Sequence, residues 1–368
     1  MRECYITKTG AYLPGRAVQN HEIERYLGAA AGEEGVKEKI LALNGIRQRH
    51  YALDEEQNET HSLYELGAEA VLNCLNGSRS SVDVEYLAAG STNTPLVAPG
   101  FATRLHDQLS QRGVIRRPIE INSNAGICSS GAQAIVNAAR AVRSGDADTA
   151  LCVGAEQPSA ILRSKVFRPP HDVEAISRDV RTSKWFMSVF LRYMLSDGAG
   201  AFLIESTPKP TGLSYRIDWS YSRSFANESP LCMKLESRSL LLSQDVTVLS
   251  KHILPFSQRV IGEALEKNGE QLSQYRSFLP HMSSYYFEKG MQQAVNSLRR
   301  DGDESLAYWT NLAERGNTGS ASIYIMLDEF AKTHLVEDGD RLLLFIPESG
   351  QFNFVVLSLT AVQKGEIQ

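Results

Sequence analysis

The sequence lacks the features that mark several large classes of protein. No apolar run approaches the roughly 18 residues that cross a membrane, and the opening MRECYITKTG lacks the apolar core of a signal peptide. We therefore expect a cytoplasmic protein with no part embedded in a membrane. Basic residues are not in excess, because 38 Lys and Arg stand against 43 Asp and Glu and the formal net charge is −5. Nucleic-acid-binding proteins usually carry a basic stripe, so no nucleic-acid partner is expected.

Cysteine is scarce and scattered. The chain of 368 residues has 5 cysteines, none in a CxxC pair, which excludes the common zinc and redox dithiol motifs. A GxSxG segment is also absent, so a serine hydrolase of that type is not supported. Isolated cysteines in a cytosolic chain are mostly inert buried thiols, and a functional one needs a further distinguishing feature. The candidates are Cys4, Cys74, Cys128, Cys152 and Cys232.

The stretch around Cys128 supplies such a feature. Residues 121–154 have the pattern of a strand end, a tight turn carrying Cys128, a long helix of small residues and a second buried strand. Cysteine attacks as a thiolate, and the start of a helix favours that anion. The small residues of the first helical turn, Ser129–Gly131, leave room for a substrate and for backbone N–H groups to reach an oxyanion. Locally, a nucleophile and a buried thiol that packs a helix end are equally good interpretations.

The second half of the chain repeats the order of elements seen around Cys128. NAGICSSGAQAIVNAA has a counterpart in RGNTGSASIYIMLDEF, which is followed by the apolar run RLLLFIPESG. This order predicts duplicated βαβ units. His281 follows an apolar segment and Asn317 precedes the second small-residue helix, so both are candidate polar groups of a site. The more ordinary alternatives are a surface histidine and an asparagine that caps its helix.

Two other segments have the pattern of a ligand-binding wall. The loop STNTPLVAPG, residues 91–100, follows a predicted buried strand, which is where α/β proteins place ligands. Residues 155–195 are irregular, aromatic and positively charged. That pattern is typical of a lid or tunnel wall, and also of a dimer contact or a satellite hydrophobic cluster.

Four blocks, spread over nearly the whole chain, resemble the β-ketoacyl-acyl-carrier-protein synthase III family of the thiolase fold. They are TGAYLPGRAVQNHEIE with GIRQRH, NAGICSSGAQAIVNAARAVRSGDADTALCVGAE, LSDGAGAFLIE, and the pair LPHMSSYYF and ERGNTGSASIYIMLDE. One block is a weak signal, whereas four in the family's order, with Cys, His and Asn in place, are a strong one. The resemblance implies an α/β, thiolase-like fold with five layers, αβαβα, from two similar halves that we place at residues 1–205 and 206–368.

The resemblance also implies a catalytic triad of Cys128, His281 and Asn317. Cys128 takes an acyl group from a thioester, while His281 and Asn317 bind the carbonyl of the acceptor thioester and stabilise its enolate. The carbanion then attacks the acyl group in a Claisen condensation, with an oxyanion hole from the amides of Cys128 and Gly350. No metal or redox cofactor is expected, because the substrates are carried on the phosphopantetheine of acyl carrier protein or of CoA.

Three departures from the family pattern bear on the substrate. KEKILALNGIR lacks the tryptophan and arginine that hold the adenine of acetyl-CoA, HMSSY stands where HQAN is usual, and PESGQF replaces a glycine-rich loop. With these departures, the sequence resembles the ketosynthase and cyclase branch of the family, which acts in dialkylresorcinol and alkyl-stilbene biosynthesis in secondary metabolism. Glu156 is expected to help close the ring, the alternative being a strand-end carboxylate capped by backbone or by an arginine. The expected substrate tunnel is lined by Trp185, Phe186, Phe190, Tyr193, Glu348 and Phe352.

The resemblance further implies partners. An acidic acyl carrier protein is expected to dock on a basic surface, and two copies are expected to pair through the edge strands of their N-terminal halves. Two other functions stay open: an acyltransferase of the same fold that acts on an alcohol or amine, and a silent subunit of a heterodimeric synthase. A silent subunit is expected to have lost a triad residue. The candidate docking residues are Arg163, Lys165, Arg168, Lys251 and Lys289.

Overall fold

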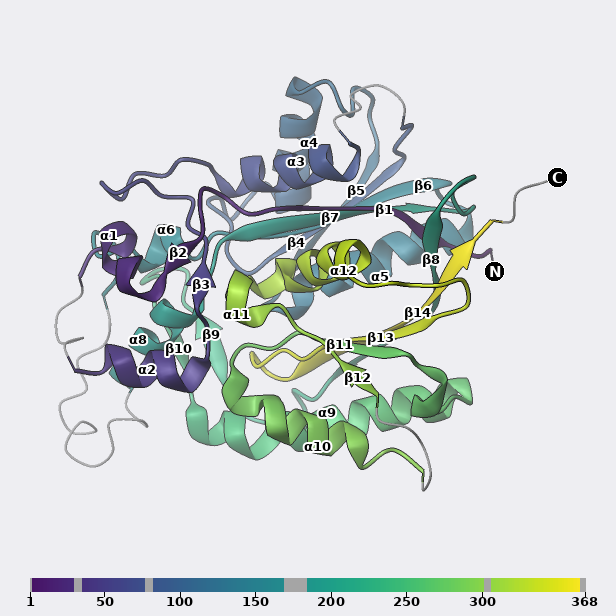
Figure 1. Ribbon diagram of the computed structural model, residues 1–368. Helices are drawn as coiled ribbons and strands as arrows, with labels where there is room; N and C mark the ends of the chain where they lie inside the picture. The colour runs from purple at the N-terminus through teal and green to yellow at the C-terminus, as the bar shows by residue number, and fades with distance from the viewer. Residues whose placement is uncertain (1, 30–34, 77–81, 169–183, 301–305, 365–368) are drawn as a thin grey trace.

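The computed structural model describes residues 2–29, 35–76, 82–168, 184–300 and 306–364, and it shows two half sheets with the same topology (Figure 1). Ten of the described strands form one sheet in the order β12-β11-β13-β14-β8-β1-β7-β6-β4-β5, and the four others form two separate two-stranded sheets. The N-terminal half contributes β1 (Tyr5–Tyr12), β4 (Tyr86–Ser91), β5 (Glu120–Ala125), β6 (Thr149–Glu156) and β7 (Gly198–Glu205). The C-terminal half contributes β8 (Leu213–Ser224), β11 (Ser277–Pro280), β12 (Ala307–Tyr308), β13 (Arg341–Ile346) and β14 (Asn353–Gln363).

Each half places its strands in the same spatial order, with the first strand beside the fifth and the third at the outer edge. In both halves the second strand is parallel to the third and fourth, and the fifth is antiparallel to the fourth and first. The halves meet at β1 and β8 through the pairs Tyr5–Arg216 and Ile6–Tyr215. The topology therefore contains the duplicated βαβ order, although the boundary at residue 205 stays a prediction.

Helices cover both outer faces of the sheets and fill the space between them (Figure 1). The N-terminal half is covered by α3 (Leu63–Cys74) and α4 (Phe101–Gln111), and the C-terminal half by α9 (Val246–Asn268) and α10 (Glu288–Asn296). Between the half sheets lie α5 (Ser129–Ser144) and α12 (Ser322–Thr333), whose apolar residues share one cluster with strands of both halves. These layers confirm the predicted five-layered thiolase-like architecture.

The remaining described elements are short or lie at the edge of the layers. Among them, α8 (Lys184–Met194) is a buried helix inside the segment expected to be irregular. Residues 169–183 of that segment lie outside the described residues. Proline at Pro255 falls inside α9. The other helices and strands are β2 (Val18–Gln19), α1 (Ile23–Leu27), α2 (Lys37–Asn44), β3 (Gln48–Arg49), α6 (Ser159–Leu162), α8 (Lys184–Met194), β9 (Met233–Leu235), β10 (Leu242–Gln244) and α11 (Leu312–Arg315).

Glycines let the start of α5 and the turn before α12 approach closely enough to form a site. A Cβ atom placed on Gly131 of α5 would lie 2.1 Å from the carbonyl oxygen of Ser320, and one on Gly154 of β6 would lie 2.5 Å from the same atom. The Tyr324 hydroxyl of α12 also donates to the carbonyl of Gly131 at 2.8 Å. The turn that starts α12 is therefore seated directly against the start of α5. This packing brings the Asn317 turn to the Cys128 turn.

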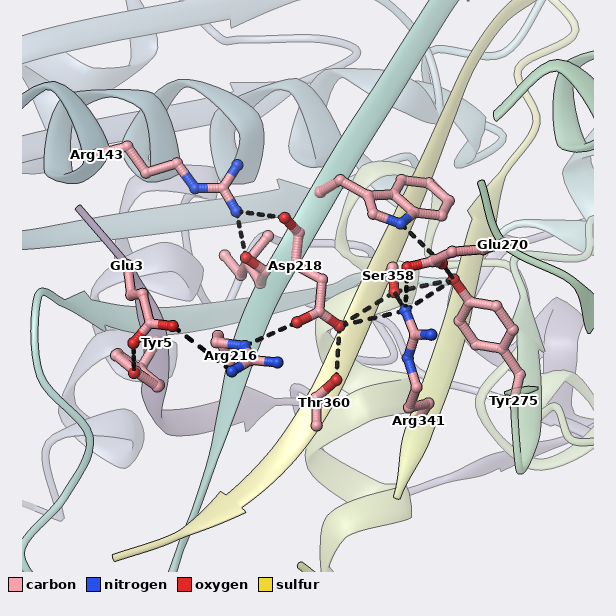
Figure 2. Close-up of polar contacts among 12 residues, drawn as sticks. Glu3, Tyr5, Arg143, Arg216, Asp218, Glu270, Tyr275, Arg341, Ser358 and Thr360 are labelled. Carbon is pink, nitrogen blue, oxygen red and sulfur yellow. Dashed lines mark hydrogen bonds and ion pairs between the residues drawn. The ribbon is translucent and has the colours of Figure 1, made fainter. Parts of the chain in front are cut away.

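A polar network joins the halves at the other end of α5 (Figure 2). Arg143 donates to the carbonyl of Asp218 on β8 at 3.0 Å. The Asp218 carboxylate accepts from Arg216 at 2.8 Å, and Arg216 also forms an ion pair of 3.5 Å with Glu3. Because α5 has 16 residues, it spans about 24 Å, so this network fixes the sheet junction far from Cys128.

Candidate active site

Cys128 lies at the N-cap position of α5, as its position before a small-residue helix suggested. Its side chain is buried, with 8% exposed. Burial is the main cause that raises the pKa of the Cys128 thiol, and the nearby carboxylates of Glu348 and Glu156 raise it further. Without a substrate, Cys128 is therefore a neutral thiol at pH 7.

His281 follows β11 and is held there by its backbone. Its N–H donates to the carbonyl of Phe345 on β13 at 2.7 Å, and the side chain is 2% exposed. Neither ring nitrogen has a hydrogen-bond partner among the described residues. Burial lowers the pKa of His281 to about 4, so the ring is neutral at pH 7. A neutral ring with one N–H is suited to donate a hydrogen bond to a carbonyl oxygen.

Asn317 is fixed by its own turn and by the end of α8. Its backbone N–H donates to the carbonyl of Met194 at 3.2 Å, and its carbonyl accepts from Ser196 at 2.9 Å. The side-chain Oδ1 accepts from the N–H of Gly319 at 2.9 Å. This bond orients the amide and leaves Nδ2 as its donor group, on a residue that lines a cavity.

Three cavities meet at Ser283, and two of them are also lined by Cys128. The central cavity is lined by Cys128, Glu156 and Asn317. The histidine cavity is lined by Cys128 and His281 together with side chains of α9 and α10. The outer cavity lies between α2, α8 and α9, and Ser283 lines all three. The sulfur is thus at the junction of the central and histidine cavities.

Glu156 combines a structural contact with a place in the central cavity. Its Oε1 accepts from the Thr92 N–H at 3.0 Å, the Thr92 hydroxyl at 2.6 Å and the Ser320 N–H at 3.2 Å. Burial raises the pKa of Glu156 to about 7. The carboxylate is therefore capped by backbone, as one alternative held, and is also poised to exchange a proton near neutral pH.

Comparison with known proteins shows what the chain is similar to. Residues 52–174 match the model described as Thiolase, N-terminal domain. Over 355 residues the chain is 26% identical to β-ketoacyl-[acyl-carrier-protein] synthase III of Thioalkalivibrio sulfidiphilus, covering 92% of this chain and 94% of that protein. The chain is a synthase III-like enzyme of the thiolase fold. The similarity to synthase III supports an enzyme of the transferase class.

Solved structures show the same fold for this synthase III-like enzyme. FabH, a synthase III from Pseudomonas aeruginosa, has 18% identity and a TM-score of 0.72, with 99% of each chain covered. OleA from Xanthomonas campestris, solved with lauric acid and lauroyl-CoA, has 19% identity and a TM-score of 0.76, covering 98% of this chain and 99% of that one. AbyA1, a tetronic acid condensing enzyme, has 18% identity and a TM-score of 0.76, covering 97% and 99%.

The structure corrects part of the expected tunnel wall of the synthase III-like enzyme. Phe186 and Phe190, one turn apart on α8, line the outer cavity as predicted. Trp185 and Tyr193 are outside the lining of the three cavities, and the Tyr193 hydroxyl instead donates to Glu24 at 3.2 Å. Trp185 lies about a quarter of a turn from Phe186 around α8, whereas Tyr193 is one turn beyond Phe190 on a similar side and is fully buried there.

Two further wall predictions are corrected at the turn between β13 and β14. Phe352 is fully buried among aromatic rings, with its ring centroid 5.6 Å from that of Phe256 and 6.3 Å from that of Phe354. Glu348 is directed against the start of α5, where Ile127 and Ser129 bond it, and it lines none of the three cavities. Phe352 serves the packing of the turn, and Glu348 joins the turn to the start of α5.

Gly350 lies beside the Cys128 turn, as expected of an oxyanion-hole residue. A Cβ atom on Gly350 would be 2.8 Å from Glu348 and 3.0 Å from the side chain of Ile127. Its carbonyl accepts from the N–H groups of Cys232 and Met233 at 2.9 and 3.0 Å, so the turn is fixed. Its role as an oxyanion donor remains a proposal.

The expected docking residues fall into two groups. Arg163 forms an ion pair of 2.8 Å with Glu59, and Lys165 and Arg168 bond backbone carbonyls of nearby segments. Lys251 on α9 and Lys289 on α10 are exposed, and each is two residues from a residue that lines the outer cavity. The role of either group in docking remains a prediction.

Several site residues carried no sequence signal. Thr92 lies in the loop predicted to bind a ligand, but the contribution of the β9–β10 hairpin, through Met233 and Leu242, matched no motif. Ser283, which lines the central, histidine and outer cavities, lies in the HMSSY segment that departs from the family pattern. Within the described part of the chain, no group of three or more His, Cys, Asp or Glu is arranged to hold a metal ion. No described helix is long and apolar enough to cross a membrane.

Proposed function

We propose that Cys128 accepts an acyl group from a thioester and that this group is then joined to a carrier-protein-bound malonyl or β-ketoacyl unit in a Claisen-type condensation. The observation that carries the proposal is the position of Cys128 at the junction of two cavities with different polar groups. One cavity holds Asn317 and Glu156, and the other holds the unpartnered ring of His281. A covalent intermediate lets the two substrates occupy the site in turn.

The first step exchanges one thioester for another. The Cys128 sulfur bonds to the acyl carbon, the donor's pantetheine sulfur leaves, and the thiol proton passes to that departing sulfur. Apolar residues of the central cavity, including Ile161, Leu195 and Leu242, provide a wall for the acyl chain. The outer cavity, between α2 and α8, provides the path for a pantetheine arm.

The second step forms the carbon–carbon bond. Hydrogen bonds from His281 and the Asn317 Nδ2 group to the acceptor's thioester carbonyl stabilise the enolate that forms there. The carbanion attacks the acyl carbon on Cys128, and the cysteine sulfur leaves. A malonyl unit provides the carbanion by losing carbon dioxide, whereas a β-ketoacyl unit provides it by losing a proton.

We propose that ring closure follows, to a cyclohexanedione or dialkylresorcinol type of product, with Glu156 as the base. Ring closure requires removal of a further proton from carbon and displacement of the carrier's thiol. Glu156 lines the same cavity as Cys128 and Asn317, and its pKa of about 7 makes it a useful base near neutrality.

Replacing Glu156 with glutamine tests this role. The amide oxygen of E156Q keeps an acceptor for Thr92 and Ser320 but cannot take up a proton. We expect acyl loading of Cys128 to persist, while the cyclic product falls by about 10²-fold or more and linear product accumulates. In the wild type, cyclic product should increase from pH 6 to 8 as Glu156 loses its proton. Mass analysis of the products measures both effects. An undiminished yield of cyclic product from E156Q would contradict this role of Glu156.

An acyl carrier protein is the proposed partner, with Lys251 and Lys289 at its dock. Both are exposed beside the outer cavity, and a carrier protein is acidic. The double variant K251E and K289E is expected to raise the KM for an acyl carrier protein substrate about tenfold while leaving that for the acyl-pantetheine alone unchanged. Charge reversal at the ion-paired Arg163 provides the control. Equal effects of both charge reversals on the carrier substrate would argue against this dock.

The homodimer also belongs to the proposal. β5 is the last strand of the sheet, it pairs only with β4 among the described strands, and Ile121 on it is 37% exposed. An open edge strand is a natural surface for pairing with a second copy. Sedimentation equilibrium of the chain, whose monomer mass is 40.7 kDa, distinguishes a dimer from a monomer.

A further inference from the structure

Glu348 touches the backbone on both sides of Cys128. Its Oε2 accepts from the N–H of Ile127 at 3.0 Å, from the N–H of Ser129 at 3.2 Å and from the Ser129 hydroxyl at 2.5 Å. Asn353 in turn donates to the Ser129 hydroxyl at 2.9 Å. Glu348 is 6% exposed, so these bonds are made in a buried site. One carboxylate of the C-terminal half thus clasps the nucleophile turn of the N-terminal half.

The carboxylate is also enclosed by backbone. A Cβ atom on Gly126 would lie 3.4 Å from its Oε2, and one on Gly350 would lie 2.8 Å from its Oε1. It therefore sits between the turn that carries Cys128 and the turn that carries Gly350. Any movement of Glu348 changes the spacing between the two turns from which the oxyanion donors are proposed to come.

Charge around Cys128 is negative rather than positive. The charged or titratable side chains near it are Glu348 from the β13–β14 turn, Glu156 from the end of β6 and His281 from the end of β11. His281 is neutral at pH 7. No described Lys or Arg forms an ion pair with Glu348, so its charge is balanced mainly by hydrogen bonds at the start of α5.

This arrangement opposes the usual effect of a helix start on cysteine. The first amides of a helix stabilise an anion, and a cysteine placed there commonly loses its proton more readily. Here the Glu348 carboxylate occupies the first amide of α5, that of Ser129, together with the Ile127 N–H just before Cys128. A second anion beside it is unfavourable. In agreement, the Glu348 carboxylate contributes to raising the pKa of the Cys128 thiol.

We propose that Glu348 is a positioning residue that holds the nucleophile turn and keeps Cys128 in its thiol form until an acyl thioester enters the site. The inference rests on the proposed role of Cys128 as nucleophile and adds how its reactivity is controlled. In the resting enzyme the thiol resists alkylation and oxidation. During loading, the thiol proton leaves with the donor's sulfur, so no free thiolate has to accumulate.

Alkylation of the intact enzyme with iodoacetamide tests the proposal without any acyl substrate. The variant E348Q keeps an amide oxygen as acceptor for Ile127 and Ser129 but removes the charge. We expect Cys128 of E348Q to be alkylated at least about tenfold faster than in the wild type at pH 7, because its pH profile shifts to lower pH. The variant E348D, which keeps the charge, should stay near the wild-type profile. Mass analysis of the peptide containing Cys128 identifies the labelled thiol.

The outcomes separate this inference from the proposed function. An E348Q profile equal to that of the wild type, or shifted to higher pH, overturns the inference, even if acyl loading on Cys128 is observed. If E348Q does not fold, as judged by circular dichroism, S129A replaces it, since loss of the Ser129 hydroxyl makes the Glu348 charge easier to neutralise. S129A should shift the profile in the same direction by a smaller amount, and an unshifted profile again overturns the inference.

Discussion

Replacing Cys128 with alanine abolishes covalent loading of an acyl group. Cys128 supplies the only thiol that lines the central and histidine cavities, among the described residues. The methyl group of C128A cannot form a thioester, so we expect the acyl-enzyme to be undetectable and condensation to fall by about 10³-fold or more. Intact-mass measurement after incubation with an acyl thioester detects the adduct directly.

A matched cysteine variant shows whether the loss is specific. Cys152 is fully buried in β6 of the same half, and its thiol donates to the carbonyl of Phe202 at 3.7 Å, away from the cavities. C152A should keep the acyl adduct, at a modest cost in stability. Undiminished labelling of C128A, or loss of labelling in C152A with its fold intact, would contradict the assignment of Cys128 as the nucleophile.

Replacing Gly131 with alanine is expected to destabilise the whole enzyme. The added methyl group would lie 2.1 Å from the Ser320 carbonyl oxygen, a distance at which one of the two backbones must shift. Overpacking of this kind costs about 1–3 kcal/mol or more. Because the same contact seats the Asn317 turn against the Cys128 turn, condensation should fall beyond what the loss of folded protein explains.

Gly262 provides the control for that substitution. It lies within α9, and a Cβ atom there would meet only the side chain of Leu298, at an ordinary 3.4 Å. Alanine is favoured over glycine inside helices by about 1 kcal/mol, so G262A should be neutral or stabilising. Urea unfolding of both variants measures the difference. Equal free energies of unfolding for G131A and G262A would contradict the close packing of α5 on the α12 turn.

The positions of Cys128, His281 and Asn317 could be predicted because each lies at an element boundary. Each of the three residues lies at the end of a strand or the start of a helix. The repeated order of elements in the two halves places those boundaries at the same side of the stacked sheets. The structure brings Cys128 to cavities shared with the other two. The family resemblance, rather than any local pattern, made the three a set.

The environment of these residues could not be predicted in the same way. Glu348 bonds Ser129 across a separation of 219 residues, and no periodicity links the two. The faces of α8 were hidden because its segment has almost continuous large side chains, so Trp185 and Phe186 looked alike although only Phe186 lines the outer cavity. Both depend on how distant elements pack, which a local sequence pattern does not contain.

The most direct test of the central claim is the product formed by the wild-type enzyme from an acyl thioester and a β-ketoacyl or malonyl carrier protein. Mass analysis with isotope label in each acyl unit shows whether both carbon chains are in one product. We predict a product joined by a new carbon–carbon bond, cyclic with the β-ketoacyl partner. The claim would be contradicted by an ester or amide formed from the acyl group and an added alcohol or amine. It would also be contradicted if no product formed and no acyl adduct on Cys128 were found.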